Sequence, residues 1–228
     1  MNSLIIFIVL GILVAIIFLS RGASDLQSKR KEYLEGIARI FEAELKEIEG
    51  AENSFHIEFK YKDVDFVYED LEDKGVEDNV VYRGFLKAKL PINLTLSFTE
   101  KSRGKIRAKM DTLSDLSSPW TEEGQHIIVP KVLEKFSVYT NMAQKANDLL
   151  ADEQVFKELA RYQSVDSRGH PVMSWDIRGG VISLRFHFGS GLKPSLMELH
   201  GDVGVIEDYV QRLLIIINKI KILAEKDN

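Results

Sequence analysis

The residues that could do acid–base chemistry in this chain are five histidines and several aspartates, and none follows a known catalytic spacing. No two histidines are four positions apart, so the paired ligands that hold zinc on a helix are missing. Four residues near a predicted hairpin are the candidates for a hydrolase or ligand-sensing site: Asp176, His187, His200 and Asp202. Ser167 lies between Asp166 and His170, but a catalytic triad is assembled in space, so this adjacency does not define one.

The sequence also lacks the usual signals for a metal or cofactor. The chain has no cysteine, which excludes disulfides, thiolate metal sites and cysteine nucleophiles. Gly179 and Gly180 fall in a predicted hairpin rather than before a helix, so they do not form a phosphate-binding loop. We therefore expect no cofactor and no metal, and we favour a non-catalytic protein over an enzyme.

Charged residues separate by sign in the first half of the chain. Residues 63–78 contain eight acidic residues and one basic residue, whereas residues 83–109 contain eight basic residues and one acidic residue. One interpretation is that neighbouring strands neutralise each other on a solvated sheet. The other is a bipolar surface that binds anionic lipid or an acidic partner, at about 1 kcal/mol per basic residue near a membrane. Its binding residues would be Arg83, Lys87, Lys89, Lys101, Arg103, Lys105, Arg107 and Lys109.

An unbroken apolar run at residues 4–19 predicts contact with a membrane. As a helix it reaches roughly 25 Å, enough for a thin bilayer core. A cleaved signal peptide normally starts with basic residues, which residues 1–3 lack. Cleavage after Gly22 remains the alternative to an uncleaved anchor. We therefore predict a transmembrane anchor over residues 1–22.

The orientation of this anchor follows from the basic residues that flank it. Four of them follow the apolar run and none precedes it: Arg21, Lys29, Arg30 and Lys31. Because positive residues favour the cytoplasmic side, we predict a single-pass protein of the cell membrane with the bulk of the chain in the cytoplasm.

Composition indicates a folded body after the anchor. The chain of 228 residues is 45% hydrophobic and 29% charged, which argues against disorder. About 205 residues are enough for one large domain or two small subdomains. The net charge of −5 argues against nucleic-acid binding, so no such partner is expected.

The elements that must position these residues begin with a helix. Apolar residues at spacings of three and four, such as Leu34, Phe41 and Ile48, predict an amphipathic helix over residues 24–48. We favour packing on a sheet over a coiled-coil stalk, because the heptad places Glu44 at a core position.

Alternating apolar residues predict strands in the first half. They cover residues 55–61, 64–68, 80–90, 92–98 and 105–110, with an acidic loop at 69–79 and Pro91 at a junction. Together these strands form an antiparallel meander.

The second half reads as strands and helices around one clear hairpin. Residues 126–129 and 136–138 predict strands, and residues 141–150 and 152–162 predict helices, the second capped by Asp152. Gly179 and Gly180 join two alternating strands, because a Gly-Gly turn tolerates positive φ at both positions. A long helix follows over residues 203–224, with an apolar stripe for the core.

Two stretches carry a resemblance to a known family. Residues 136–140 (FSVYT), followed by Ala146 and the pair at residues 149–150, form an F-x-V-x-(S/T)…A…L-L pattern, and residues 82–85 (YRGF) open a strand. The chain resembles an uncharacterised family of bacterial membrane-anchored proteins of unknown function. That resemblance implies a membrane anchor and supplies no catalytic residues.

The sequence thus predicts an α+β fold: one N-terminal transmembrane helix followed by antiparallel sheets with packed helices. The expected divisions are an anchor (1–22), a helix plus meander (23–115) and a second α+β subdomain ending in a long helix (116–228). The expected function is a membrane-anchored interaction or scaffold domain without catalysis. The alternative is the membrane-bound hydrolase or ligand sensor described above.

Overall fold

The structure, a computed structural model, describes residues 27–74, 80–100, 125–127, 136–161, 164–165, 171–190 and 203–225. The predicted anchor lies outside these ranges and stays a prediction. Within them, no helix has both the length and the apolar character that crossing a bilayer requires.

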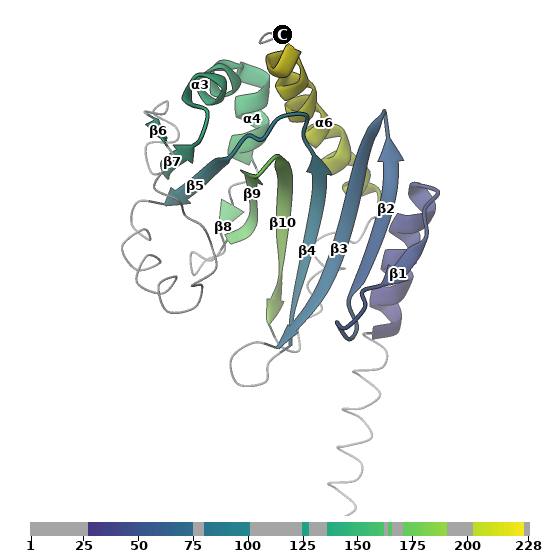
Figure 1. The fold of residues 1–228 in the computed structure, drawn as a ribbon. Helices are drawn as coiled ribbons and strands as arrows, with labels where there is room; N and C mark the ends of the chain where they lie inside the picture. The colour runs from purple at the N-terminus through teal and green to yellow at the C-terminus, as the bar shows by residue number, and fades with distance from the viewer. Residues whose placement is uncertain are drawn as a thin grey trace, which may run out of the picture.

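The described strands form one antiparallel sheet (Figure 1). They are β1 (Leu45–Glu47), β2 (Phe55–Tyr61), β3 (Val64–Lys74), β4 (Val80–Lys89), β5 (Leu96–Glu100), β6 (Gln125–Ile127), β7 (Phe136–Thr140), β8 (Ser164–Val165), β9 (Pro171–Arg178) and β10 (Val181–Ser190). Their order is β1-β2-β3-β4-β10-β9-β5-β7-β6, with β8 paired to β9 beside this path. The α+β fold with an antiparallel sheet is therefore confirmed.

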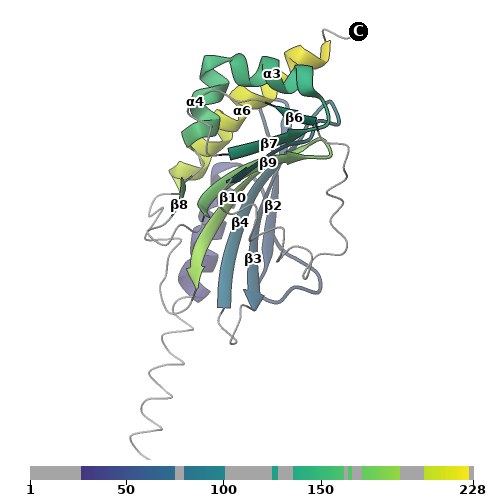
Figure 2. The same cartoon turned by 90° about the vertical axis from the view of Figure 1, so that its left-hand side faces the viewer.

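The described helices gather on one face and at one end of this sheet (Figures 1 and 2). They are the helix at residues 27–40, α3 (Ala143–Ala151), α4 (Glu153–Arg161) and α6 (Gly204–Glu225). Trp175 of β9 donates its indole N–H to the carbonyl oxygen of Leu159 in α4 at 2.8 Å. The core lies between these layers, and its fully buried side chains include Leu34, Ile37, Ile57, Phe66, Leu86, Ile182, Leu184, Val210 and Ile217.

The first helix ends earlier than its sequence pattern predicts. Glu42 has a φ of +52°, and the N–H groups of Glu42 and Ala43 bond to the carbonyl oxygens of Arg39 and Ala38. This is the hydrogen-bond pattern that closes a helix with one left-handed residue. Residues 45–47 then pair with β2 as an edge strand, so the predicted helix is wrong beyond residue 40. Leu34, Ile37 and Ala38 of this helix are buried in the core, which agrees with the prediction that the helix packs on a sheet.

The acidic stretch after Tyr68 is a strand up to Lys74, not the predicted loop. β3 pairs with β4 along its length, from Phe66 opposite Ala88 to Lys74 opposite Val80. Its acidic residues do not prevent this pairing, because they alternate between the two faces of the sheet. Residues 75–79 lie outside the described part.

The connection between β4 and β5 also differs from the prediction. A strand was predicted at residues 92–98, but β5 starts at Leu96. The backbone before it bonds instead to the hairpin turn: Leu90 N–H donates to the Gly180 carbonyl at 2.7 Å, and Gly180 N–H to the Leu94 carbonyl at 3.1 Å.

The second half follows its predicted order. The hairpin of β9 and β10 turns at Gly179 and Gly180, whose φ values are +55° and +76°. Asp152 caps α4 by accepting hydrogen bonds from the N–H groups of Gln154 and Val155. Because β4 pairs with β10 and β5 with β7, the segments on both sides of residue 115 contribute strands to the same sheet.

Candidate functional site

The face of the sheet opposite the helices is lined by side chains that alternate with the buried ones. No described helix covers this face (Figure 2). We call it the open face and define it by His56, Glu58 and Lys60 on β2, Asp65, Val67, Glu69 and Leu71 on β3, Arg83, Phe85, Lys87 and Lys89 on β4, Asp176 and Arg178 on β9, and Val181, Ser183 and Arg185 on β10.

Positive charge concentrates in the middle of the open face. Arg83, Lys87 and Lys89 project from β4, and the strand register places Arg185 of β10 opposite Phe85. We call these four cations the basic column. At about 3.4 Å per residue, its β4 members span roughly 20 Å along one strand. Sequence reasoning missed Arg185 because the pairing of β4 with β10 is not visible in local patterns.

Contacts within the sheet hold part of the basic column in place. Lys87 Nζ lies 2.6 Å from a carboxylate oxygen of Glu69 on β3, so neutralisation between neighbouring strands is present for this pair. The ring of Phe85 lies under two cations, with Lys87 Nζ at 5.2 Å and Arg185 Cζ at 5.4 Å from its centroid. Such cation–π contacts restrict both side chains before any ligand arrives.

The two sides of the open face differ in net charge. Over β2 and β3, Glu58, Asp65 and Glu69 are balanced in part by Lys60. Over β4, β9 and β10, five described cations stand against the single carboxylate of Asp176, which pairs with Arg178 at 2.9 Å. The other predicted binding residues lie outside the described part: Lys101, Arg103, Lys105, Arg107 and Lys109.

Of the four candidates for an enzymatic site, the two that the structure describes lie apart. Asp176 aligns with Ser183 on β10, whereas His187 lies four residues further along that strand, opposite Arg83. The positions of Asp176 and His187 are thus about 14 Å apart along the sheet, too far for a direct hydrogen bond. His200 and Asp202 lie outside the described residues.

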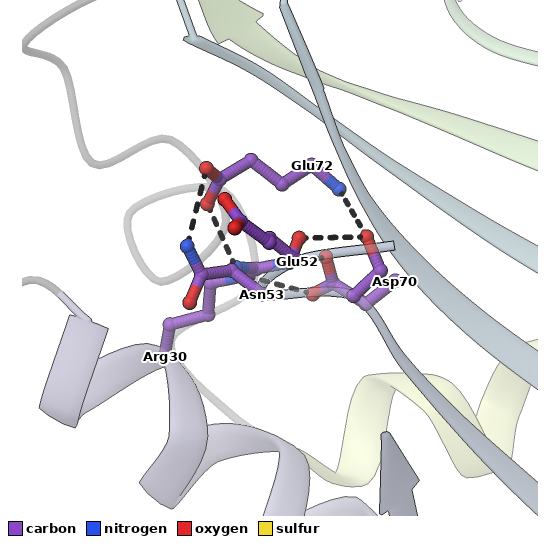
Figure 3. A network of polar contacts seen from close by, with 6 residues as sticks. Arg30, Glu52, Asn53, Asp70 and Glu72 are labelled. Carbon is purple, nitrogen blue, oxygen red and sulfur yellow. Dashed lines mark hydrogen bonds and ion pairs between the residues drawn. The ribbon is translucent and has the colours of Figure 1, made fainter. Parts of the chain in front are cut away.

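A second polar cluster, missed by sequence reasoning, lies on the covered face (Figure 3). Arg30 of the first helix donates a hydrogen bond to Asp70 of β3, with Nη2 2.5 Å from Oδ1, and its Nη1 lies 3.6 Å from Glu72. The side chains of Arg30 and Asp70 are 7% and 0% exposed. The rings of Tyr82 and Phe55 lie 4.3 and 5.6 Å from the guanidinium.

The turn before β2 extends this Arg30 cluster. Ser54 is buried and accepts a hydrogen bond from the N–H of Glu72 at 3.0 Å, and Asn53 donates to the Glu72 carboxylate at 3.3 Å. Burial raises the pKa of Asp70 above its ordinary value, while the hydrogen bond and charge of Arg30 act against this rise. The cluster therefore attaches the first helix to β3 through a buried ion pair.

Neither a metal-binding group in the described residues nor a match to a known protein assigns a role to these two sites. In the described ranges, no three histidine, aspartate or glutamate side chains are grouped to hold a metal ion. Comparison with protein-family models, curated proteins and solved structures finds no match to this chain. The resemblance to a family of membrane-anchored proteins stays a prediction.

Proposed function

We propose that this protein is a membrane-anchored interaction domain without catalysis, whose open face binds anionic lipid or an acidic partner. The apolar run at residues 4–19 supplies the anchor, and the basic residues after it favour a cytoplasmic body. In this proposal the folded domain is held at the membrane while its sheet presents a binding surface.

The excess of positive charge on the open face carries this proposal. The chain as a whole has a net charge of −5, yet the described side chains of the open face comprise six cations and four carboxylates, and five of these cations project from β4, β9 and β10, where Asp176 is the one described carboxylate. Charges collected on one surface attract anions at short range even when the net charge is negative. The exposed fractions of Lys87 and Arg178, 34% and 48%, leave both side chains in contact with solvent.

The Arg30 cluster supports the same reading from the other side of the sheet. Arg30 follows the predicted anchor by eight residues and is bound to β3 through Asp70. A buried ion pair at this position couples the membrane-proximal helix to the sheet, so the open face keeps a fixed orientation relative to that helix.

Two anionic probes test the proposal. Full-length protein in nanodiscs of neutral lipid is offered polyglutamate and, separately, vesicles that contain phosphatidylserine. We expect at least one probe to bind in a salt-sensitive way, and reversal of Arg83, Lys87 and Lys89 to glutamate to weaken that binding roughly tenfold or more.

The matched control reverses three lysines that lie outside both the open face and the flank of the anchor: Lys62 in the turn between β2 and β3, Lys157 on α4 and Lys221 on α6. This triple variant changes the net charge by the same amount and leaves the open face intact. Absence of binding to both probes, or an equal loss in the control variant, would contradict the proposal.

A further inference from the structure

We propose that the open face docks an amphipathic helix of a partner protein. The apolar side chains of that helix pack against those of β3 and β4, and its carboxylates pair with the cations of the basic column. This inference rests on the proposed function of the open face and specifies the chemistry of its partner. It follows from the way apolar and charged side chains alternate on this face.

The apolar residues of the open face stand directly beside its cations. Val67 pairs across the strands with Lys87, and Leu71 pairs with Arg83. Val67, Leu71 and Phe85 are each half-buried, and Val181, opposite Lys89, is 37% exposed. A lipid headgroup layer or an extended polyanion would bind the cations and leave these apolar groups in water. A partner that offers both kinds of side chain on one surface buries them together.

Phe85 argues against single-stranded nucleic acid as the ligand. Such ligands stack their bases on aromatic rings of a sheet. Here the Phe85 ring already carries Lys87 and Arg185 at 5.2 and 5.4 Å from its centroid. A base would have to displace both cations, which are the groups that attract its phosphates.

The dimensions of the surface fit one helix. The basic column is about 20 Å long, which equals the length of roughly 13 helical residues, and a helix about 10 Å wide covers two neighbouring strands. Carboxylates at positions i and i+4 of a helix repeat every 6 Å or so, close to the repeat of about 6.8 Å between alternate strand residues. Helices already cover the other face, so a docked helix would complete a three-layer arrangement.

The test compares three stapled helical peptides by fluorescence anisotropy against the full-length protein in neutral nanodiscs. The first has a leucine stripe flanked by glutamates, the second has the same composition scrambled, and the third keeps the stripe but has lysine flanks. We expect the first peptide to bind at least tenfold tighter than either of the others, and not to bind empty nanodiscs.

Variants separate the two parts of the surface. Lys87→Glu with Lys89→Glu should weaken the first peptide at least tenfold, and so should Val67→Asn with Leu71→Asn. Ile222→Gln, on α6 where the side chain is 51% exposed, is the apolar control and should have no effect. Unchanged thermal unfolding of each variant shows that the loss arises at the surface rather than from misfolding.

The outcomes distinguish this inference from the function on which it rests. Equal binding of the scrambled peptide, or binding of phosphatidylserine vesicles alone, overturns the helix partner and leaves the open face as an anion-binding surface. If polyglutamate, vesicles and all three peptides fail to bind, both the inference and the proposed function are wrong.

Discussion

Replacing Arg30 with methionine should loosen the first helix from the sheet and destabilise the domain. The side chain of Asp70 is 0% exposed and accepts hydrogen bonds from Arg30 Nε and Nη2. Without Arg30 its carboxylate stays buried beside Glu72 with no cation to balance it. Removing one partner of a buried ion pair typically costs about 3–5 kcal/mol of the free energy of unfolding, and we expect a loss in that range at pH 7.

The double variant Arg30→Met with Asp70→Leu isolates the cause. Replacing both partners of a buried pair with apolar residues is often close to neutral, so the double variant should recover most of the lost stability. Urea unfolding of the full-length protein in micelles measures both values, and hydrogen exchange at residues 27–40 shows whether the helix is loosened. A single variant as stable as the wild type, or a double variant no better than the single one, would refute the reasoning.

The pH dependence of the single variant has a definite sign. Burial raises the folded-state pKa of Asp70, so the folded protein binds a proton that the unfolded chain has released. Stability therefore falls as pH rises from the ordinary aspartate pKa through the folded value. Without Arg30 that pKa rises further, so the deficit of the Arg30→Met variant should shrink as the pH is lowered from 7 toward about 4.

Three further predictions concern the turn, the cap and the topology. Gly180→Ala should destabilise the protein more than Gly50→Ala in thermal unfolding. Both glycines have φ near +77°, where an alanine costs about 1–2 kcal/mol of stability. Only at Gly180 would the added Cβ also lie 2.9 Å from a backbone carbonyl oxygen, that of Ile92. Equal losses would show that this close contact does not matter. Asp152→Ala should lose about 1 kcal/mol at pH 7 through the missing cap. The hydrogen bond from Lys219 and the capped N–H groups lower the pKa of Asp152, so this stability is lost as pH falls through the folded value, and the variant should converge with the wild type in acid. A persistent gap in acid would contradict this cause. A cysteine at Lys157, which is 69% exposed, should resist an impermeant thiol reagent in intact cells and react after lysis; labelling in intact cells would reverse the predicted orientation.

Much of the fold could be predicted from local patterns, because the spacing of apolar residues within a strand or helix marks the face that it buries. The alternation of Ile57 and Phe59 with Glu58 and Lys60 predicts β2 and its buried face correctly. The same logic located the Gly-Gly hairpin and α6. These elements depend on neighbouring residues only, so their periods appear directly in the sequence.

The errors arise where long-range partners decide the outcome. The helical spacing of apolar residues continues to Leu45, which predicts that the helix continues as well. In the structure, however, Leu45 belongs to a strand that pairs with β2, opposite Ile57. Asp70 reads as a loop residue until Arg30, 40 positions earlier, is placed beside it. Three of the four cations in the basic column were predicted as binding residues from the sequence of β4, whereas Arg185 was found only through the pairing of β4 with β10.

The position of β10 between β4 and β9 has a consequence for synthesis of the chain. β4 ends at Lys89 and its neighbour β10 begins at Val181, so β4 is synthesised long before β10. At a translation rate of about 5–20 residues per second, the edge of β4 that will pair with β10 stays unpaired for roughly 5–20 s. During this interval the nascent sheet exposes an unpaired strand to other chains. Lysines and an arginine on that strand repel identical nascent copies and so oppose aggregation until the hairpin of β9 and β10 inserts.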